Sequence, residues 1–80
     1  MIDTNNLGRK IADARKRLKL TQNDLALRVG VTAQAVSKWE QGRSCPDIAI
    51  LDEIADALGI SLFELLGMAE NGDPSEKQSS

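Results

Sequence analysis

The stretch that decides the fold runs from residue 20 to residue 44 and reads LTQNDLALRVGVTAQAVSKWEQGRS. It contains the same pattern twice: an apolar residue, a threonine, three further residues and a second apolar residue. This pattern is typical of a helix start, because the threonine caps free backbone N–H groups and the two apolar side chains pack around it. We therefore expect two helices, over residues 22–29 and 33–41, that begin just after Thr21 and Thr32.

The connection between these two helices consists of Gly30, Val31 and Thr32, so the chain must turn sharply there. Ala26 is small at the point where the two backbones are expected to cross. Gly30 tolerates the left-handed backbone conformation that ends a helix. Val36 is expected to pack back under both helices. The spacing of Ala26, Gly30 and Val36 is typical of a helix-turn-helix.

Three more helices are predicted outside this stretch. Residues 5–19 carry apolar side chains at spacings of three and four, and the helix is expected to be capped within residues 4–6. Residues 48–58 follow a Pro-Asp pair in which the aspartate suits a helix cap. Residues 62–66 follow a serine cap, and Glu64 is placed to bond back to that serine in a capping box.

No segment alternates convincingly between apolar and polar residues with a period of two, so the sequence offers no candidate strand. We therefore predict an all-α fold, a compact five-helix bundle with a helix-turn-helix, as one domain over residues 1–67. Residues 68–80 are polar and have little to bury, so they are expected to form a disordered tail or a linker.

The composition excludes several classes of function. The 80 residues include no histidine and one cysteine, which removes the usual general base, disulfides and Cys/His metal sites. No apolar run approaches the ~20 residues of a membrane span, and no signal peptide is evident. We expect a cytoplasmic domain that is not an enzyme, with no metal, no cofactor, no membrane contact and no evident small-molecule ligand.

The net charge of −2 conceals an uneven distribution. Residues 1–45 carry nine basic and four acidic side chains, a net charge of +5, whereas residues 46–80 carry one basic and eight acidic side chains, a net charge of −7. A local basic surface binds phosphates whatever the total charge. The composition alone leaves open a second interpretation, in which both halves are ordinary solvated surfaces without a partner.

The predicted helix over residues 33–41 has two different faces. At 3.6 residues per turn, Thr32, Val36 and Trp39 share one side, and we expect Trp39 to lie in the core rather than to stack on bases. The opposite side carries amides, a hydroxyl and a cation but no acid. Groups of these kinds read the edges of bases, and an alanine methyl contacts thymine. The members of this face are Gln34, Ser37, Lys38 and Gln41, with Ala33 on its flank.

Residues 21–42 and the Gly-Arg-Ser-Cys-Pro run that begins at Gly42 resemble the repressor and Cro-like transcription regulators of phages and bacteria. The resemblance rests on the Lys-Leu-Thr-Gln segment, the Ala-x-x-x-Gly turn and the Ser-x-Trp-Glu-x-Gly segment, and it covers roughly residues 5–67. It implies a lambda-repressor-like domain that binds double-stranded operator DNA, usually as a two-fold dimer, with its third helix in the major groove. It also implies a transcriptional repressor that is bacterial or phage-encoded and associated with the nucleoid.

The resemblance also implies roles for individual residues. An ion pair between Arg15 and Glu40 is expected to tie the first helix to the third, and Ala26, Gly30, Val36 and Trp39 are expected to be structural. Ala33 stands where some members of the family place a polar base-reading side chain. Base contacts are implied for Ala33, Gln34, Ser37 and Lys38, and phosphate contacts for Thr21, Gln22, Gln41, Arg43 and Ser44.

The assembly and the partner each leave an alternative open. The last helix and its flanks carry more apolar surface than one short helix can bury, which favours a homodimer through Leu62, Phe63, Leu65, Leu66 and Met68. The alternative is that these side chains pack into the core of the monomer. The rival to DNA binding is a protein-interaction module, such as an antitoxin or an anti-repressor, whose acidic second half docks a basic partner.

Overall fold

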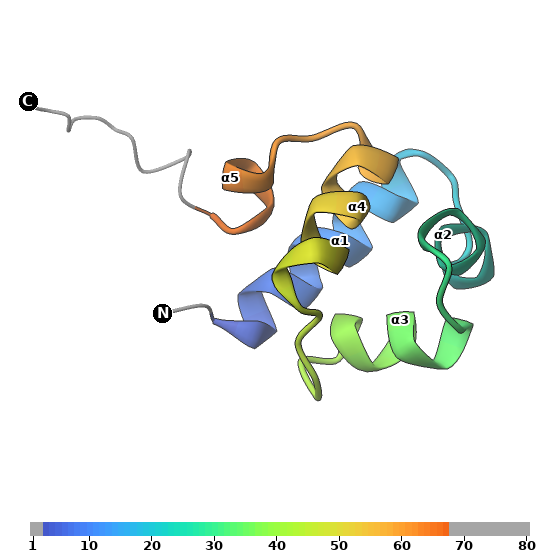
Figure 1. Cartoon of the computed structure of the whole chain (residues 1–80), viewed down its shortest axis with the longest axis horizontal. Coiled ribbons are helices and arrows are strands. Elements are labelled where there is room, and N and C mark those ends of the chain that lie inside the picture. Colours follow the sequence, from blue (N-terminus) through green and yellow to red (C-terminus); the bar gives the residue numbers. More distant parts are fainter. Residues whose placement is uncertain (1–2, 68–80) are drawn as a thin grey trace, which may run out of the picture.

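Five helices fill residues 3–67, the part of the chain that the computed structural model describes (Figure 1). This part of the molecule contains no strand, so the prediction of an all-α, five-helix fold is confirmed. The predicted polar tail, residues 68–80, lies outside the described residues. The helices are α1 (Thr4–Arg17), α2 (Gln22–Val29), α3 (Ala33–Glu40), α4 (Ile48–Leu58) and α5 (Leu62–Leu65).

The ends of α1 differ from the prediction. Asp3 caps the helix rather than a side chain within residues 4–6, because its carboxylate accepts hydrogen bonds from the backbone N–H groups of Asn5 and Asn6. The helix also ends two residues early, since Lys19 adopts a left-handed backbone with φ 60°. Leu18, which continues the apolar spacing of Leu7, Ile11 and Ala14 in the sequence, lies beyond the end of α1 and is 48% exposed.

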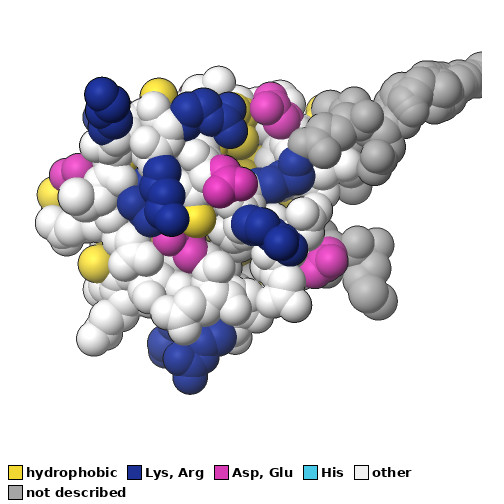
Figure 2. Space-filling model, turned by 180° about the vertical axis from the view of Figure 1, so that it is seen from behind, with side chains coloured by type: hydrophobic (Ala, Val, Ile, Leu, Met, Phe, Trp, Pro, Cys, Tyr) yellow, Lys and Arg dark blue, Asp and Glu magenta, His cyan; other side chains and the backbone are white. Residues whose placement is uncertain are grey.

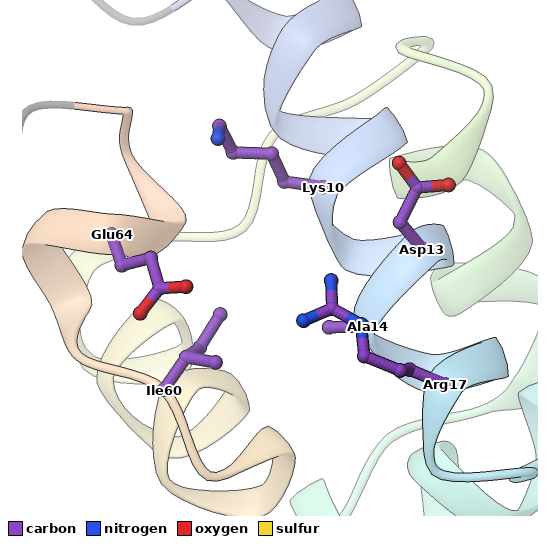
Figure 3. Close-up of a pocket in the computed structure, with 6 residues that line it drawn as sticks. All are labelled: Lys10, Asp13, Ala14, Arg17, Ile60 and Glu64. Atoms are coloured by element: carbon purple, nitrogen blue, oxygen red, sulfur yellow. The ribbon is translucent and has the colours of Figure 1, made fainter. Parts of the chain in front are cut away.

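The helix starts follow the predicted caps, with one difference. Thr21 and Asp24 form a complete capping box, in which the Thr21 hydroxyl accepts from the Asp24 N–H and the Asp24 carboxylate accepts from the Thr21 N–H, both at 2.9 Å. Ser61 accepts from the Glu64 N–H at 2.9 Å. The Glu64 carboxylate does not complete a second capping box but faces a pocket of about 100 Å³ between α1 and α5, where Lys10 and Arg17 also point (Figure 3).

The core is aliphatic and draws on all five helices. Ile11, Leu25, Val36 and Ile54 are fully buried, and Trp39 is 6% exposed. Helix α1 packs against α3, and α2 packs against both α3 and α4 (Figure 1). Burial of these side chains supplies most of the stabilisation of so small a domain, because apolar surface removed from water contributes about 25 cal/mol per Å². No helix within residues 3–67 has the length and apolar character needed to cross a bilayer.

Gly8 sets the distance between α1 and α3. A Cβ atom at this position would overlap the carbonyl oxygen of Trp39 and would lie 2.8 Å from that of Glu40. This role of Gly8 cannot be predicted from the sequence, because a glycine inside a helix carries no signal about what lies beside it. The close approach matters for the site, since it places the end of α3 directly against α1.

Candidate nucleic-acid interface

The turn between α2 and α3 has the predicted geometry. Gly30 adopts a left-handed backbone with φ 82°, and its N–H donates to the Ala26 carbonyl at 2.8 Å. The Val31 N–H donates to the same carbonyl at 2.9 Å, which closes the turn. Ala26 is 1% exposed where α2 packs against α3, and Val36 is fully buried below. This turn fixes the orientation of α3, which lies along one edge of the molecule (Figure 1).

The outward side of α3 is open to a partner. Gln34 and Lys38 are exposed, and Ala33 and Ser37 are half-buried. Val36 and Trp39 hold the other side of the helix in the core. Helix α3 therefore presents an amide and a cation to solvent, with a half-exposed hydroxyl beside them and the Ala33 methyl packed partly against the core. The outward side of the helix carries no acid.

The segment after α3 continues this polar surface. The Arg43 guanidinium donates to Gln41 Oε1 at 3.3 Å, and Gln41 Nε2 donates to Ser37 Oγ at 2.8 Å. Arg43 and Ser44 are both exposed. Thr4 Oγ1 donates to the Gly42 carbonyl at 3.4 Å, which ties this segment to the start of α1. Two of the five residues implied as phosphate contacts, Gln41 and Arg43, are thus linked by hydrogen bonds to α3.

An ion pair joins α1 to the end of α3. Arg15 Nε donates to Glu40 Oε2 at 2.6 Å and Arg15 Nη2 donates to Glu40 Oε1 at 3.0 Å, with the side chains 11% and 7% exposed. Arg15 Nη1 also donates to the Leu20 carbonyl at 2.8 Å. The hydrogen bonds to Glu40 hold the pKa of Arg15 above its ordinary value, although burial opposes them. The two residues that the resemblance pairs are therefore in direct contact.

Glu40 has a further partner that the sequence analysis missed. Gln22 Nε2 donates to Glu40 Oε1 at 3.0 Å, so the first residue of α2 is bound to the last residue of α3. The two residues stand 18 positions apart, and no local pattern connects them. The only signal in the sequence is that Gln22 opens a helix and Glu40 ends the next one.

The charges of the described residues divide at the end of the helix-turn-helix. All nine Lys and Arg side chains within residues 3–67 precede Ser44, whereas residues 44–67 carry five acids and no Lys or Arg. On the face behind the view of Figure 1, basic side chains are spread widely with single acids between them (Figure 2). The Lys and Arg side chains of the described residues therefore all lie within residues 9–43, and α3 itself contributes Lys38.

These features define a class of protein: a small helix-turn-helix domain in which the second helix of the motif, α3, exposes a polar face. A helix-turn-helix family model matches residues 11–65, and the chain belongs to this family. An uncharacterised HTH-type transcriptional regulator of Methanothermobacter thermautotrophicus is 49% identical over 49 residues, 61% of this chain and 71% of that protein. The cryptic phage CTXphi transcriptional repressor RstR of Vibrio cholerae is 38% identical over 58 residues, 72% of this chain and 52% of that protein.

Solved structures share the fold. The P22 c2 repressor in complex with a synthetic operator is similar with a TM-score of 0.74 and 35% identity, over 78% of this chain and 94% of that one. Hydroxypropylphosphonic acid epoxidase from S. wedmorenis is similar with a TM-score of 0.75 and 27% identity, over 81% of this chain but only 35% of that one. The chain spans between 38% and 64% of the length of several relatives that it matches. The resemblance to repressor and Cro-like regulators is confirmed.

Proposed function

We propose that this chain is a sequence-specific repressor that binds double-stranded DNA and reads the major groove with α3. The observation that carries the proposal is the acid-free outward face of α3, held rigid by the core and continued by Arg43 and Ser44. The relative RstR is a transcriptional repressor by name, and the P22 c2 repressor is bound to an operator in its structure. The site of action is then the cytoplasm, on the nucleoid.

Four side chains of α3 are proposed to face the bases. The Gln34 amide bonds adenine in two places, Lys38 reaches the acceptors of guanine, and the Ala33 methyl contacts thymine. Ser37 accepts a hydrogen bond from Gln41, which leaves its hydroxyl proton for a base acceptor. Truncating Gln34 or Lys38 to alanine is expected to reduce operator affinity by about 1–3 kcal/mol and to relax the preference at one base pair.

A second group of side chains is proposed to bind phosphates. Phosphate contacts fix the register of the protein on the duplex but carry no sequence information. The exposed guanidinium of Arg43 supplies charge, and Gln41 and Ser44 lie beside it. Thr21 and Gln22 supply the corresponding contacts at the start of α2, where the positive end of the helix dipole favours an anion.

A two-fold dimer through α5 is proposed on a smaller surface than the sequence indicated. Leu65 is fully buried and Leu62 and Leu66 pack against the core, so these side chains serve the monomer first. Phe63 is 63% exposed, and we place it at the centre of the interface. Met68 lies outside the described residues. Such a dimer places two α3 helices about one helical turn of DNA, ~34 Å, apart on an inverted repeat.

The rival proposal is a protein-interaction module that uses the acidic second half. The absence of any Lys or Arg from residues 44–67 favours it, because five acids there would complement a basic partner. An enzyme is disfavoured, because the relatives named above are transcriptional regulators and the epoxidase resembles this chain over only 35% of its own length.

One titration separates the two proposals. Fluorescence anisotropy with a random-sequence duplex at two salt concentrations is expected to show affinity that falls steeply with salt, because phosphate contacts release counterions. A protein-docking module would show no duplex affinity at either concentration. Selection of bound fragments from genomic DNA then gives the operator, on which sedimentation should count two copies of the chain per duplex.

A further inference from the structure

The hydrogen bond between Gln22 and Glu40 fixes which end of the Gln22 amide faces outward. A carboxylate only accepts hydrogen bonds, so Gln22 must turn its Nε2 group toward Glu40. The amide nitrogen carries two N–H groups, and Glu40 takes one of them. The second N–H remains available for an anion, while the carbonyl oxygen, which a phosphate would repel, cannot take the place of the nitrogen.

Glu40 is itself held in place by Arg15. Arg15 grips both carboxylate oxygens, at 2.6 and 3.0 Å, and the same guanidinium donates to the Leu20 carbonyl at 2.8 Å. Leu20 directly precedes Thr21, the residue that caps α2. The ends of α1 and α3 and the start of α2 are therefore joined by one network of charge-assisted hydrogen bonds, which are shorter and stronger than neutral ones. Gln22 is the outermost member of that network.

We propose that Glu40 is a positioning residue for DNA binding: it holds the Gln22 amide with its free N–H directed at a backbone phosphate before DNA arrives. The inference rests on the proposed function and deepens it, since it explains why a carboxylate stands beside a surface that binds a polyanion. A side chain held in its bound orientation loses less conformational entropy on binding, so preorganisation raises affinity. Glu40 itself does not touch the DNA.

Positioning and simple charge predict opposite effects of one substitution. Glu40→Gln removes a negative charge close to the proposed DNA surface, and charge alone predicts tighter binding to every duplex. The new amide replaces one carboxylate oxygen with an NH2 group, which only donates. In either orientation that group faces an N–H donor, Arg15 Nε at the position of Oε2 or Arg15 Nη2 and Gln22 Nε2 at the position of Oε1, so the network cannot form intact. Positioning therefore predicts weaker binding, by several-fold, to a random-sequence duplex. Asp13→Asn is the matched control, because Asp13 is an exposed carboxylate of α1 that lines the pocket beside α5.

The test is a double-mutant cycle of Gln22→Ala and Glu40→Gln, measured by anisotropy with a random-sequence duplex at low salt. In the wild type, Gln22→Ala is expected to weaken binding about tenfold, the lower range for a hydrogen bond to a charged group. In the Glu40→Gln background the same change should weaken binding about twofold or less, because the amide is no longer directed. Asp13→Asn should bind as tightly as the wild type or more tightly.

Four results would overturn the inference or its premise. Equal losses on Gln22→Ala in both backgrounds, or tighter binding by Glu40→Gln, would refute positioning while leaving DNA binding intact. A wild-type chain without salt-dependent duplex affinity would refute the proposed function, and the inference with it. If Glu40→Gln does not fold, side-chain amide exchange in the wild type decides: the Nε2 protons of Gln22 should exchange more slowly than those of exposed Gln34, and equal rates would refute the geometry.

Discussion

Replacing Gly8 with alanine sets two effects of opposite sign against each other. Alanine is the better helix former, and in the interior of α1 it should gain about 1 kcal/mol over glycine. The added Cβ, however, would overlap the Trp39 carbonyl oxygen and lie 2.8 Å from the Glu40 carbonyl oxygen. Both neighbours are backbone atoms of α3, so neither can move aside by changing a rotamer.

The close contact should prevail. Forcing an extra carbon into a well-packed interface costs typically 1–3 kcal/mol, and contacts with backbone favour the upper end of that range. With about 3 kcal/mol lost and about 1 kcal/mol gained, Gly8→Ala should lower the free energy of unfolding by about 2 kcal/mol. For a domain of this size that corresponds to a fall in Tm of roughly 10 °C, measured by circular dichroism.

Asp13→Ala supplies the matched control, because Asp13 is an exposed position of the same helix. It should keep or raise Tm, since alanine has the higher helix propensity and meets no neighbour there. A Gly8→Ala chain with a Tm equal to or above that of the wild type would show that α1 and α3 do not approach as closely as described. The contacts of Glu40 with Arg15 and Gln22, which depend on that close approach, would then be in doubt as well.

Three further predictions follow from the proposed interface and from the caps. Gln34→Ala should weaken operator binding more than random-duplex binding, whereas Arg43→Ala should weaken both by the same factor; equal losses for Gln34→Ala would contradict base reading. Phe63→Ser should leave Tm almost unchanged, because Phe63 is 63% exposed, yet reduce the copies per operator duplex from two to one in sedimentation; two copies would exclude α5 as the interface. Hydrogen bonds from the Thr21 N–H and hydroxyl lower the pKa of Asp24. The Asp24 carboxylate therefore stabilises the folded protein at pH values above its unfolded-state pKa, and this stabilisation is lost as pH falls through its lower folded-state pKa. On acidification, the Tm of Asp24→Asn should accordingly fall less steeply than the Tm of the wild type. The same dependence of Tm on pH in both proteins would argue against this cap.

Local chemistry made much of the fold predictable from the sequence. The helices α2 and α3 begin after Thr21 and Thr32, as the six-residue pattern of a threonine cap between two apolar residues predicts. All the residues of this pattern are close neighbours in the chain. The turn at Gly30 is equally local, because the left-handed backbone conformation that ends α2 favours glycine. The exposed side of α3 follows from helical periodicity once Val36 and Trp39 are recognised as core. Each of these features depends on neighbours close in the chain.

Contacts between distant segments were decided only in three dimensions. The Gln22–Glu40 hydrogen bond and the approach of α1 to α3 at Gly8 depend on how the helices cross, and helical periodicity does not specify that crossing. The same limit applies to α5, where five apolar residues looked alike in sequence but Leu65 is fully buried and Phe63 is 63% exposed. The sequence by itself therefore determined the helices, the turn and the exposed face of α3. The tertiary packing decided which side chains of those helices are held in place and which remain for a partner, because burial depends on all the neighbours of a residue at once.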